Sequence, residues 1–306
     1  MNNKIEISIL VPAYNESQNL GELIKQINEN FSKSHFKNLY EIIIINDGSS
    51  DGTKDVVLNL YNDYENLKII NLKENYGKAY ALDMGIQNSK GSIIATIDAD
   101  LQYSAKNLLI MTDMIYQGED LINGKRVVRQ DNFLNIFFSK IYNFLIRSFF
   151  GIKIEDFFSG IKVYKKEIYN LMDYSGMARF IVFYSKKYNF KISELKVDHF
   201  KRQFGETSYK LHDRIILSIK DIFSLIFCVY LGKKGFYNLR QVVFSLYLFV
   251  FLFILTINFF SEKLLTRYFF LIFFSLIIFI IFNFIVTSFL DSKSNKNENL
   301  IKDILK

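Results

Sequence analysis

The sequence EIIIINDGSSDGT occupies residues 41–53. Its run of isoleucines predicts a short buried strand over Glu41–Ile45, because apolar β-branched residues favour covered strands. The acidic and small residues that follow predict a tight turn, in which Ser50, Asp51 or Thr53 would cap the next helix. A buried strand, a polar turn and a helix in succession form the repeating unit of parallel α/β sheets.

The same unit recurs along the first hundred residues. Further buried strands are predicted at residues 5–11, 67–72 and 92–97. Apolar residues recur at helical spacing at 20–31 and 79–86. A polar cluster follows each strand, at residues 12–16, 47–53, 75–78 and 98–102. Ligands of parallel sheets bind beyond the carboxyl ends of the strands, so we expect these clusters to form one binding site.

Composition excludes several classes of protein. Half of the 306 residues are hydrophobic and there is one proline, which excludes disordered, collagen-like and proline-rich linker proteins. The single cysteine, Cys228, excludes an internal disulfide framework. The three histidines show no zinc-ligand spacing, and no Ser/His/Asp or Cys/His arrangement is evident. The net charge of +7 favours anionic partners, but nucleic acid is disfavoured because no recognition motif is present.

The C-terminal part is much less charged than the rest. Two uncharged stretches, 241–261 and 268–290, can each cross a hydrocarbon core that needs about 20 helical residues. The short polar link between them predicts a transmembrane hairpin, and flanking Lys and Arg residues place both termini in the cytoplasm. No signal peptide is recognisable at the N-terminus. The predicted order is a folded domain at 1–210, an amphipathic interfacial helix at 211–235, two spans within 236–292 and a cytoplasmic tail at 293–306.

The triplet Asp98-Ala99-Asp100 is a candidate for metal chemistry because it directly follows a predicted strand, although such a triplet is not specific by itself. Two carboxylates that flank a small residue at a strand end can hold a divalent cation and, through it, a diphosphate. The amide of Gln102 can add an oxygen ligand, and all-oxygen ligation fits Mg2+ or Mn2+.

The other polar clusters admit a structural role and a binding role. The 47–53 segment fits an ordinary turn, although a carboxylate there can also accept hydrogen bonds from a base or a ribose. Around Pro12 a rigid turn is the simplest interpretation, but Tyr14 can stack on a base and Glu16 can bond a sugar hydroxyl. Lys78 follows a tight turn and suits either a phosphate or an ordinary loop.

In combination the motifs are specific. VPAYNE, INDGSSDGT, NYGKAYAL and DADLQ, in this order and spacing, resemble the family-2 glycosyltransferases. The resemblance continues through GKR (124–126), DFFSG (156–160), MARF (177–180) and HFKRQFGETSY (199–209), and covers about residues 5–235. It implies a GT-A fold, which is a nucleotide-sugar-binding α/β domain. With its C-terminal hairpin the chain looks most like the dolichol- and undecaprenyl-phosphate sugar synthases.

The resemblance also implies roles for matched residues. The donor side is predicted to include Pro12, Tyr14, Glu16, Asp47, Lys78, Asp98 and Ala99. The metal ion would be held by Asp98, Asp100 and Gln102, and the donor phosphates would face Arg126 and Arg202. Acceptor contacts are predicted for Arg129, Ser159 and Arg179, with Asp156 beside the acceptor. Catalysis would rest on Asp156, Asp100 and Arg126.

Three positions depart from the family's pattern. The prolines usual after DADLQ are replaced by Tyr103-Ser104-Ala105, and a His common in the MARF segment is Ala178. A Lys frequent before the last tyrosine of the basic loop is Ser208. This last change removes a phosphate contact unless Lys201 or Lys210 substitutes.

These observations predict a membrane-anchored inverting glycosyltransferase that moves one sugar from a nucleotide-diphosphate sugar to a polyprenyl phosphate. A lipid phosphate is already anionic, whereas a hydroxyl acceptor would need Asp156 as general base. Transfer to a carbohydrate hydroxyl of a surface polysaccharide or glycolipid stays open, as does a non-catalytic membrane module that binds nucleotide sugar. The sugar, the base and whether the chain forms a homo-oligomer are not fixed by the sequence.

Overall fold

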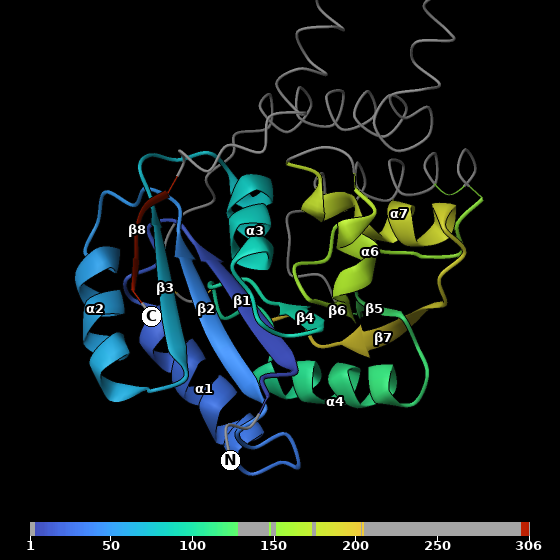
Figure 1. The fold of residues 1–306 in the computed structure, drawn as a ribbon, viewed down its shortest axis with the longest axis horizontal. Coiled ribbons are helices and arrows are strands. Elements are labelled where there is room, and N and C mark those ends of the chain that lie inside the picture. The colour runs from blue at the N-terminus through green and yellow to red at the C-terminus, as the bar shows by residue number, and fades with distance from the viewer. Residues whose placement is uncertain are drawn as a thin grey trace, which may run out of the picture. The chain divides into compact units, whose positions relative to one another are not determined.

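The computed structural model describes residues 4–127, 147, 151–172, 176–202, 204 and 301–305. The strands are β1 (Ile7–Ala13), β2 (Tyr40–Asn46), β3 (Leu67–Leu72), β4 (Ile93–Thr96), β5 (Leu121–Arg126), β6 (Lys162–Lys165), β7 (Ile192–Val197) and β8 (Ile301–Leu305). Within the described residues they form one sheet in the order β7-β5-β6-β4-β1-β2-β3-β8 (Figure 1). Neighbouring strands are parallel except where β6 and β8 pair with their neighbours.

Helices cover both faces of the sheet (Figure 1). They are α1 (Leu20–Ser32), α2 (Thr53–Asp63), α3 (Lys78–Gln87), α4 (Ala105–Tyr116), α6 (Lys166–Asn170), the 3-10 helix η1 (Ala178–Phe180) and α7 (Ile181–Lys187). The main core lies under α1, α2 and α4, where Ile9 and Val11 of β1 are buried together with Leu23 of α1. α3 lies on the opposite face, so close that a Cβ on Gly85 would stand 2.9 Å from Ile45 Cδ1.

The predicted mostly parallel α/β sheet with flanking helices is confirmed. The strand predicted at 67–72 is β3, and the strands predicted at 41–45 and 92–97 correspond to β2 and β4. The two segments with helical spacing form α1 and α3. Hydrophobic periodicity therefore located these elements because each one buries a continuous apolar face.

The predicted end of the first strand is wrong. β1 continues to Ala13, so Pro12 lies inside a strand rather than in a turn beyond it. Pro12 pairs in register with Ile45 of β2, whereas the pairing of β1 with β4 stops at Leu10. A proline is tolerated here because the β4 ladder has already ended where its missing amide hydrogen would be needed.

Gly48 brings two polar clusters together. Its φ is +66°, and a Cβ at this position would stand 2.6 Å from the backbone nitrogen of Asn75. An L side chain fits neither that backbone angle nor that space. The turn after β2 can therefore contact the loop after β3 only because residue 48 is a glycine.

Strand β8 was not among the predicted elements. It pairs antiparallel with β3, with Ile304 opposite Ile70 and Ile301 opposite Leu72. Figure 1 shows it in red beside β3. Because β3 and β8 share one sheet, residues 301–305 belong to the same structural unit as the N-terminal domain.

Among the described residues, no helix has both the length and the apolar character that a membrane crossing requires. The predicted spans at 241–261 and 268–290 lie outside the described residues, as does the predicted interfacial helix at 211–235. These three segments stay predictions.

We expect Gly48→Ala to destabilise the domain by about 1–3 kcal/mol, because a methyl group would push the two backbones apart. The matched control is Gly52→Ala in the same turn, where the nearest atom to an added Cβ is Ser17 Cβ at 3.9 Å. Thermal unfolding of both variants beside the unmodified chain measures the effect. Equal melting temperatures for the two variants would contradict the contact assigned to Gly48.

Candidate active site

The loops after β1 and β2 are joined by hydrogen bonds. Asn15 Oδ1 accepts from the backbone nitrogen of Ser50 at 2.9 Å, and the backbone nitrogen of Asn15 donates to Ser49 Oγ at 3.0 Å. The neighbouring Tyr14 is 36% exposed, as a residue that stacks on a ligand must be. Pro12 precedes this loop and is half-buried.

Asp47 is buried and holds the loop after β3. Its two carboxylate oxygens accept from the backbone nitrogens of Tyr76 and Gly77, at 2.8 and 2.9 Å. Burial raises the pKa of Asp47, and the two N–H donors oppose that shift. Both oxygens are thus engaged in placing the loop that leads into Lys78, and a contact of Asp47 with the nucleotide stays a prediction.

Asp98 lies just beyond β4 and is paired with Lys78 from the first turn of α3. Burial raises the pKa of Asp98, but the charge and the hydrogen bond of Lys78, aided by Lys162 and Arg126, outweigh it. The pKa therefore lies below its ordinary value, and Asp98 is ionised at neutral pH. Two of the predicted donor residues, Lys78 and Asp98, are thus in direct contact.

Asp100 and Glu16 share one cation. Arg202 Nη2 lies 2.8 Å from Glu16 Oε1 and 3.3 Å from Asp100 Oδ2. Burial raises the pKa of both carboxyl groups, and Arg202 opposes the rise in each case. Arg202, predicted to face the donor phosphates, thus contacts Asp100 of the acidic triplet and Glu16, which was predicted to bind the nucleotide.

Gln102 and Phe200 tie the segment after β7 to the metal triplet. The backbone nitrogen of Phe200 donates to Gln102 O at 2.9 Å, and Gln102 Nε2 donates to Phe200 O at 3.3 Å. These contacts place Arg202, two residues later, beside the carboxylates. They engage the amide nitrogen of Gln102 and not its side-chain oxygen, which is the atom predicted to bind a metal ion.

The residues of the triplet fit a divalent cation. The charge of Asp98, added to burial, raises the pKa of Asp100, so the two carboxylates repel each other and a cation would relieve that repulsion. Ala99 between them is buried. In the part of the chain that the structure describes, no group of three His, Cys, Asp or Glu side chains could hold a metal ion. Further ligands would have to come from an amide oxygen and from a bound diphosphate.

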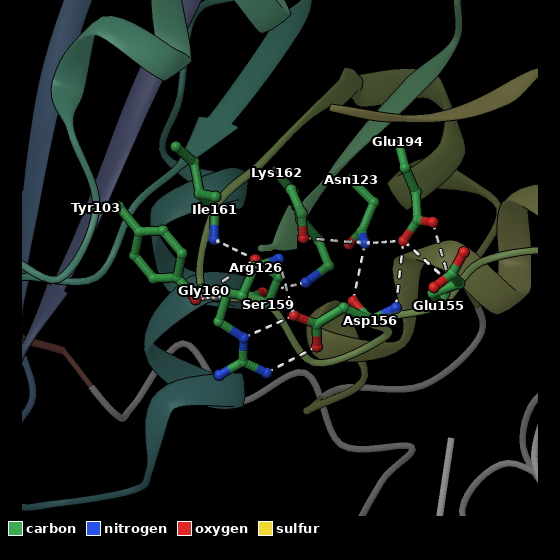
Figure 2. Close-up of polar contacts among 11 residues, drawn as sticks. Tyr103, Asn123, Arg126, Glu155, Asp156, Ser159, Gly160, Ile161, Lys162 and Glu194 are labelled. Atoms are coloured by element: carbon green, nitrogen blue, oxygen red, sulfur yellow. Dashed lines mark hydrogen bonds and ion pairs between the residues drawn. The ribbon is translucent and has the colours of Figure 1, made fainter. Parts of the chain in front are cut away.

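A second acidic group of the site is Asp156, in the loop before β6. Asp156 is 6% exposed and forms a bidentate pair with Arg126, whose Nε and Nη2 lie 2.6 and 2.7 Å from its two oxygens (Figure 2). The backbone nitrogen of Arg126 also donates to Asp156 Oδ2 at 3.3 Å. The structure therefore brings together the predicted phosphate-binding arginine and the predicted acceptor-side aspartate.

Lys162 is a charged residue of this site that sequence reasoning missed. It lies in β6 and is 7% exposed, and its ammonium group donates to Ser159 O. Burial and the charge of Lys78 lower the pKa of Lys162 to about 7, although the carboxylates of Asp156 and Asp98 oppose this shift. One signal was available, because a lysine inside the apolar strand segment IKVY has to be buried or lie on an edge.

Tyr103 links the loop after β4 to the loop before β6. Its hydroxyl accepts from the backbone nitrogen of Gly160 at 3.0 Å and from Ser159 Oγ at 3.4 Å (Figure 2). A Cβ on Gly160 would clash with the carboxylate of Asp98. Ser159, predicted to bind the acceptor, is 3% exposed, and its hydroxyl is engaged with Tyr103. Tyr103 stands where the family usually has proline, so this departure has a structural role.

Arg179 and Arg129 were also predicted to contact the acceptor substrate, and the structure describes only Arg179. The guanidinium of Arg179 lies over the rings of Phe158 and Phe180, at 5.2 and 5.4 Å from their centroids, which gives it a packing role. Arg129 lies outside the described residues.

The sequence of this chain is similar to a known family and to several characterised proteins. Residues 8–172 match the family described as Glycosyl transferase family 2. Dodecaprenyl-phosphate galacturonate synthase of Rhizobium johnstonii is 31% identical over 76% of this chain and 70% of its own length. Undecaprenyl-phosphate 4-deoxy-4-formamido-L-arabinose transferase of Aeromonas hydrophila is 27% identical over 73% of this chain and 67% of its own length.

Among solved structures, glucosyl-3-phosphoglycerate synthase from Mycobacterium tuberculosis has a TM-score of 0.57 at 15% sequence identity. The likeness covers 72% of this chain and 78% of that chain, and it supports a GT-A-like fold. Because the family match extends over more than half of the chain and includes the strands and loops that carry the acidic residues, the chain belongs to glycosyl transferase family 2.

Proposed function

We propose that the chain is a membrane-anchored inverting glycosyltransferase that moves one sugar from a nucleotide-diphosphate sugar to a polyprenyl phosphate. The observation that carries this proposal is the arrangement of charge at one edge of the sheet. Basic side chains and carboxylates lie together there, in the residues Lys78, Asp98, Asp100, Arg202, Arg126, Asp156 and Lys162. Such a site suits substrates that both carry phosphate, and two relatives are named as polyprenyl-phosphate enzymes.

On the donor side, Asp98, Asp100 and the oxygen of Gln102 would hold a divalent cation. A cation bound there would stabilise the charge that develops on the departing nucleoside diphosphate. Lys78 and Arg202, already beside these carboxylates, add positive charge at the same place. The Mycobacterium tuberculosis neighbour was solved with Mn2+ and UDP, which supports a divalent metal in general.

On the acceptor side, the geometry favours a phosphate over a hydroxyl. Asp156 already accepts three hydrogen bonds from Arg126, on both of its carboxylate oxygens, so less of its acceptor capacity is left for removing a proton. A hydroxyl acceptor needs such a base, whereas a phosphate is already a nucleophile and needs cations to align it. Arg126 supplies such a cation next to Asp156, and Lys162, whose pKa is lowered to about 7, adds positive charge in its protonated form.

Membrane anchoring rests on the two uncharged stretches, 241–261 and 268–290. The pairing of β8 with β3 supports an even number of crossings, because residues 301–305 then lie on the same side of the bilayer as the catalytic domain. Two crossings meet that condition. We place the catalytic domain and both termini in the cytoplasm, in keeping with the distribution of Lys and Arg around the hairpin.

Transfer to a lipid phosphate can be tested directly. Membranes that contain the chain are incubated with labelled nucleotide sugars, Mn2+ or Mg2+, and either polyprenyl phosphate or the matching polyprenol. We expect lipid-extractable label with polyprenyl phosphate alone. Label with polyprenol or with an oligosaccharide would favour a hydroxyl acceptor, and no label with any donor would contradict the proposal.

In the same assay, Asp100→Asn should lower kcat/KM by at least about 100-fold, because metal stabilisation of the leaving group is worth several kcal/mol. Asp113→Asn is the matched control, since Asp113 lies in α4, is 38% exposed and pairs with His35. Initial rates at several metal concentrations measure the loss. A wild-type rate for Asp100→Asn would show that this carboxylate does not bind the cation.

The topology predicts a pattern of cysteine labelling. In a Cys228→Ser background, Thr266→Cys in the hairpin link should react with a membrane-impermeant maleimide in intact cells. Ser294→Cys should react only after the membrane is permeabilised. Labelling of both positions from outside, or the reverse pattern, would rule out a cytoplasmic C-terminus.

A further inference from the structure

The loop that carries Asp156 is held by Glu194, a residue of β7. Glu194 Oε1 accepts from the backbone nitrogen of Asp156 at 3.2 Å and from that of Glu155 at 3.1 Å (Figure 2). Its second oxygen also accepts from the backbone nitrogen of Glu155 at 3.1 Å. Both backbone N–H groups of this two-residue stretch are therefore bonded to one carboxylate.

Asn123 completes this support from β5. Its Nδ2 donates to Asp156 O at 2.8 Å and to Glu194 Oε1 at 3.2 Å. Asn123 and Glu194 are register partners in the parallel strands β5 and β7, so their side chains lie on the same face of the sheet. Asn123 is fully buried and Glu194 is half-buried. The register of two strands thus fixes where the Asp156 backbone can lie.

We propose that Glu194 is a positioning residue that, with Asn123, sets the place of Asp156 and through it the orientation of the Arg126 guanidinium. This inference rests on the proposed function, in which Arg126 aligns the acceptor phosphate. Within the part of the chain that the structure describes, the Glu194 carboxylate bonds to two backbone N–H groups and to the Asn123 amide, so in this proposal it acts through the loop that it holds.

The position of Asp156 matters because Asp156 holds Arg126, and Arg126 is proposed to align a charged acceptor. Arg126 is held by Asp156 through its side chain and its backbone nitrogen, so a shift of the loop would carry the guanidinium with it. A displacement of about 1 Å of an aligned group can lower a rate about 100-fold. Loss of Glu194 would leave two backbone donors without acceptors and allow that displacement.

Substitutions at residue 194 can change the length of the side chain and its hydrogen-bond acceptor separately. Glu194→Ala removes the acceptor, and Glu194→Asp keeps the charge but is one methylene too short to reach. Glu194→Gln keeps an oxygen at the position of Oε1. We expect kcat to fall about 10- to 100-fold in the Ala and Asp variants with the donor KM unchanged, and to recover most of its value in the Gln variant.

Glu155→Ala is the matched control. Its side chain is 52% exposed and pairs with Lys125, and the substitution keeps the backbone N–H that Glu194 binds. We expect wild-type kinetics for this variant. A wild-type kcat in Glu194→Ala, or a larger loss in Glu194→Gln than in Glu194→Asp, would overturn the proposal.

Hydrogen–deuterium exchange gives a readout that does not require transfer activity. Peptides that cover residues 152–160 should exchange faster in the Ala and Asp variants than in the wild type and the Gln variant. Unchanged exchange in Glu194→Ala would overturn the positioning role. If the wild-type chain fails to glycosylate polyprenyl phosphate but the exchange result holds, the acceptor assignment is wrong and the support of Asp156 by Glu194 stands.

Discussion

The structure depends on compensating the negative charge of carboxylates that are buried at one edge of the sheet. Removing a carboxylate from water costs several kcal/mol unless a cation or several hydrogen bonds replace the solvent. The compensating ion pairs are Lys78 with Asp98, Arg202 with Asp100 and Glu16, and Arg126 with Asp156. Each cation comes from a different part of the chain, so these ion pairs join α3, β5 and the segment after β7 at the same place.

The same balance has a consequence for ligand binding. The cations at this edge are already matched by carboxylates, so a diphosphate alone would leave the site with an excess of negative charge. A diphosphate that arrives with a divalent cation adds far less net charge. The arrangement therefore favours binding of metal and diphosphate together, and it explains why the acidic triplet and the basic side chains lie in contact.

For a second set of carboxylates, hydrogen bonds from backbone N–H groups compensate the negative charge. Asp47 accepts from Tyr76 and Gly77, and Glu194 accepts from Glu155 and Asp156. Neither carboxylate needs a cation for these bonds, and each one fixes a loop by its main chain. Lys78 follows the first of these loops and Asp156 lies in the second, and their side chains pair with Asp98 and Arg126.

The sequence by itself determined the parallel sheet, the helices α1 and α3 and the four polar clusters, because strand and helix periodicity and turn chemistry are local properties. The motifs VPAYNE, INDGSSDGT, NYGKAYAL and DADLQ also indicated the glycosyltransferase family, because they occur in the family's order and spacing. Only the tertiary structure decided the pairing of Arg202 with Glu16, which lie 186 residues apart, the burial of Lys162, the position of Pro12 inside β1 and the reach of Glu194 to Asp156. Such contacts depend on the register of strands that are distant in sequence, and no local pattern encodes that register.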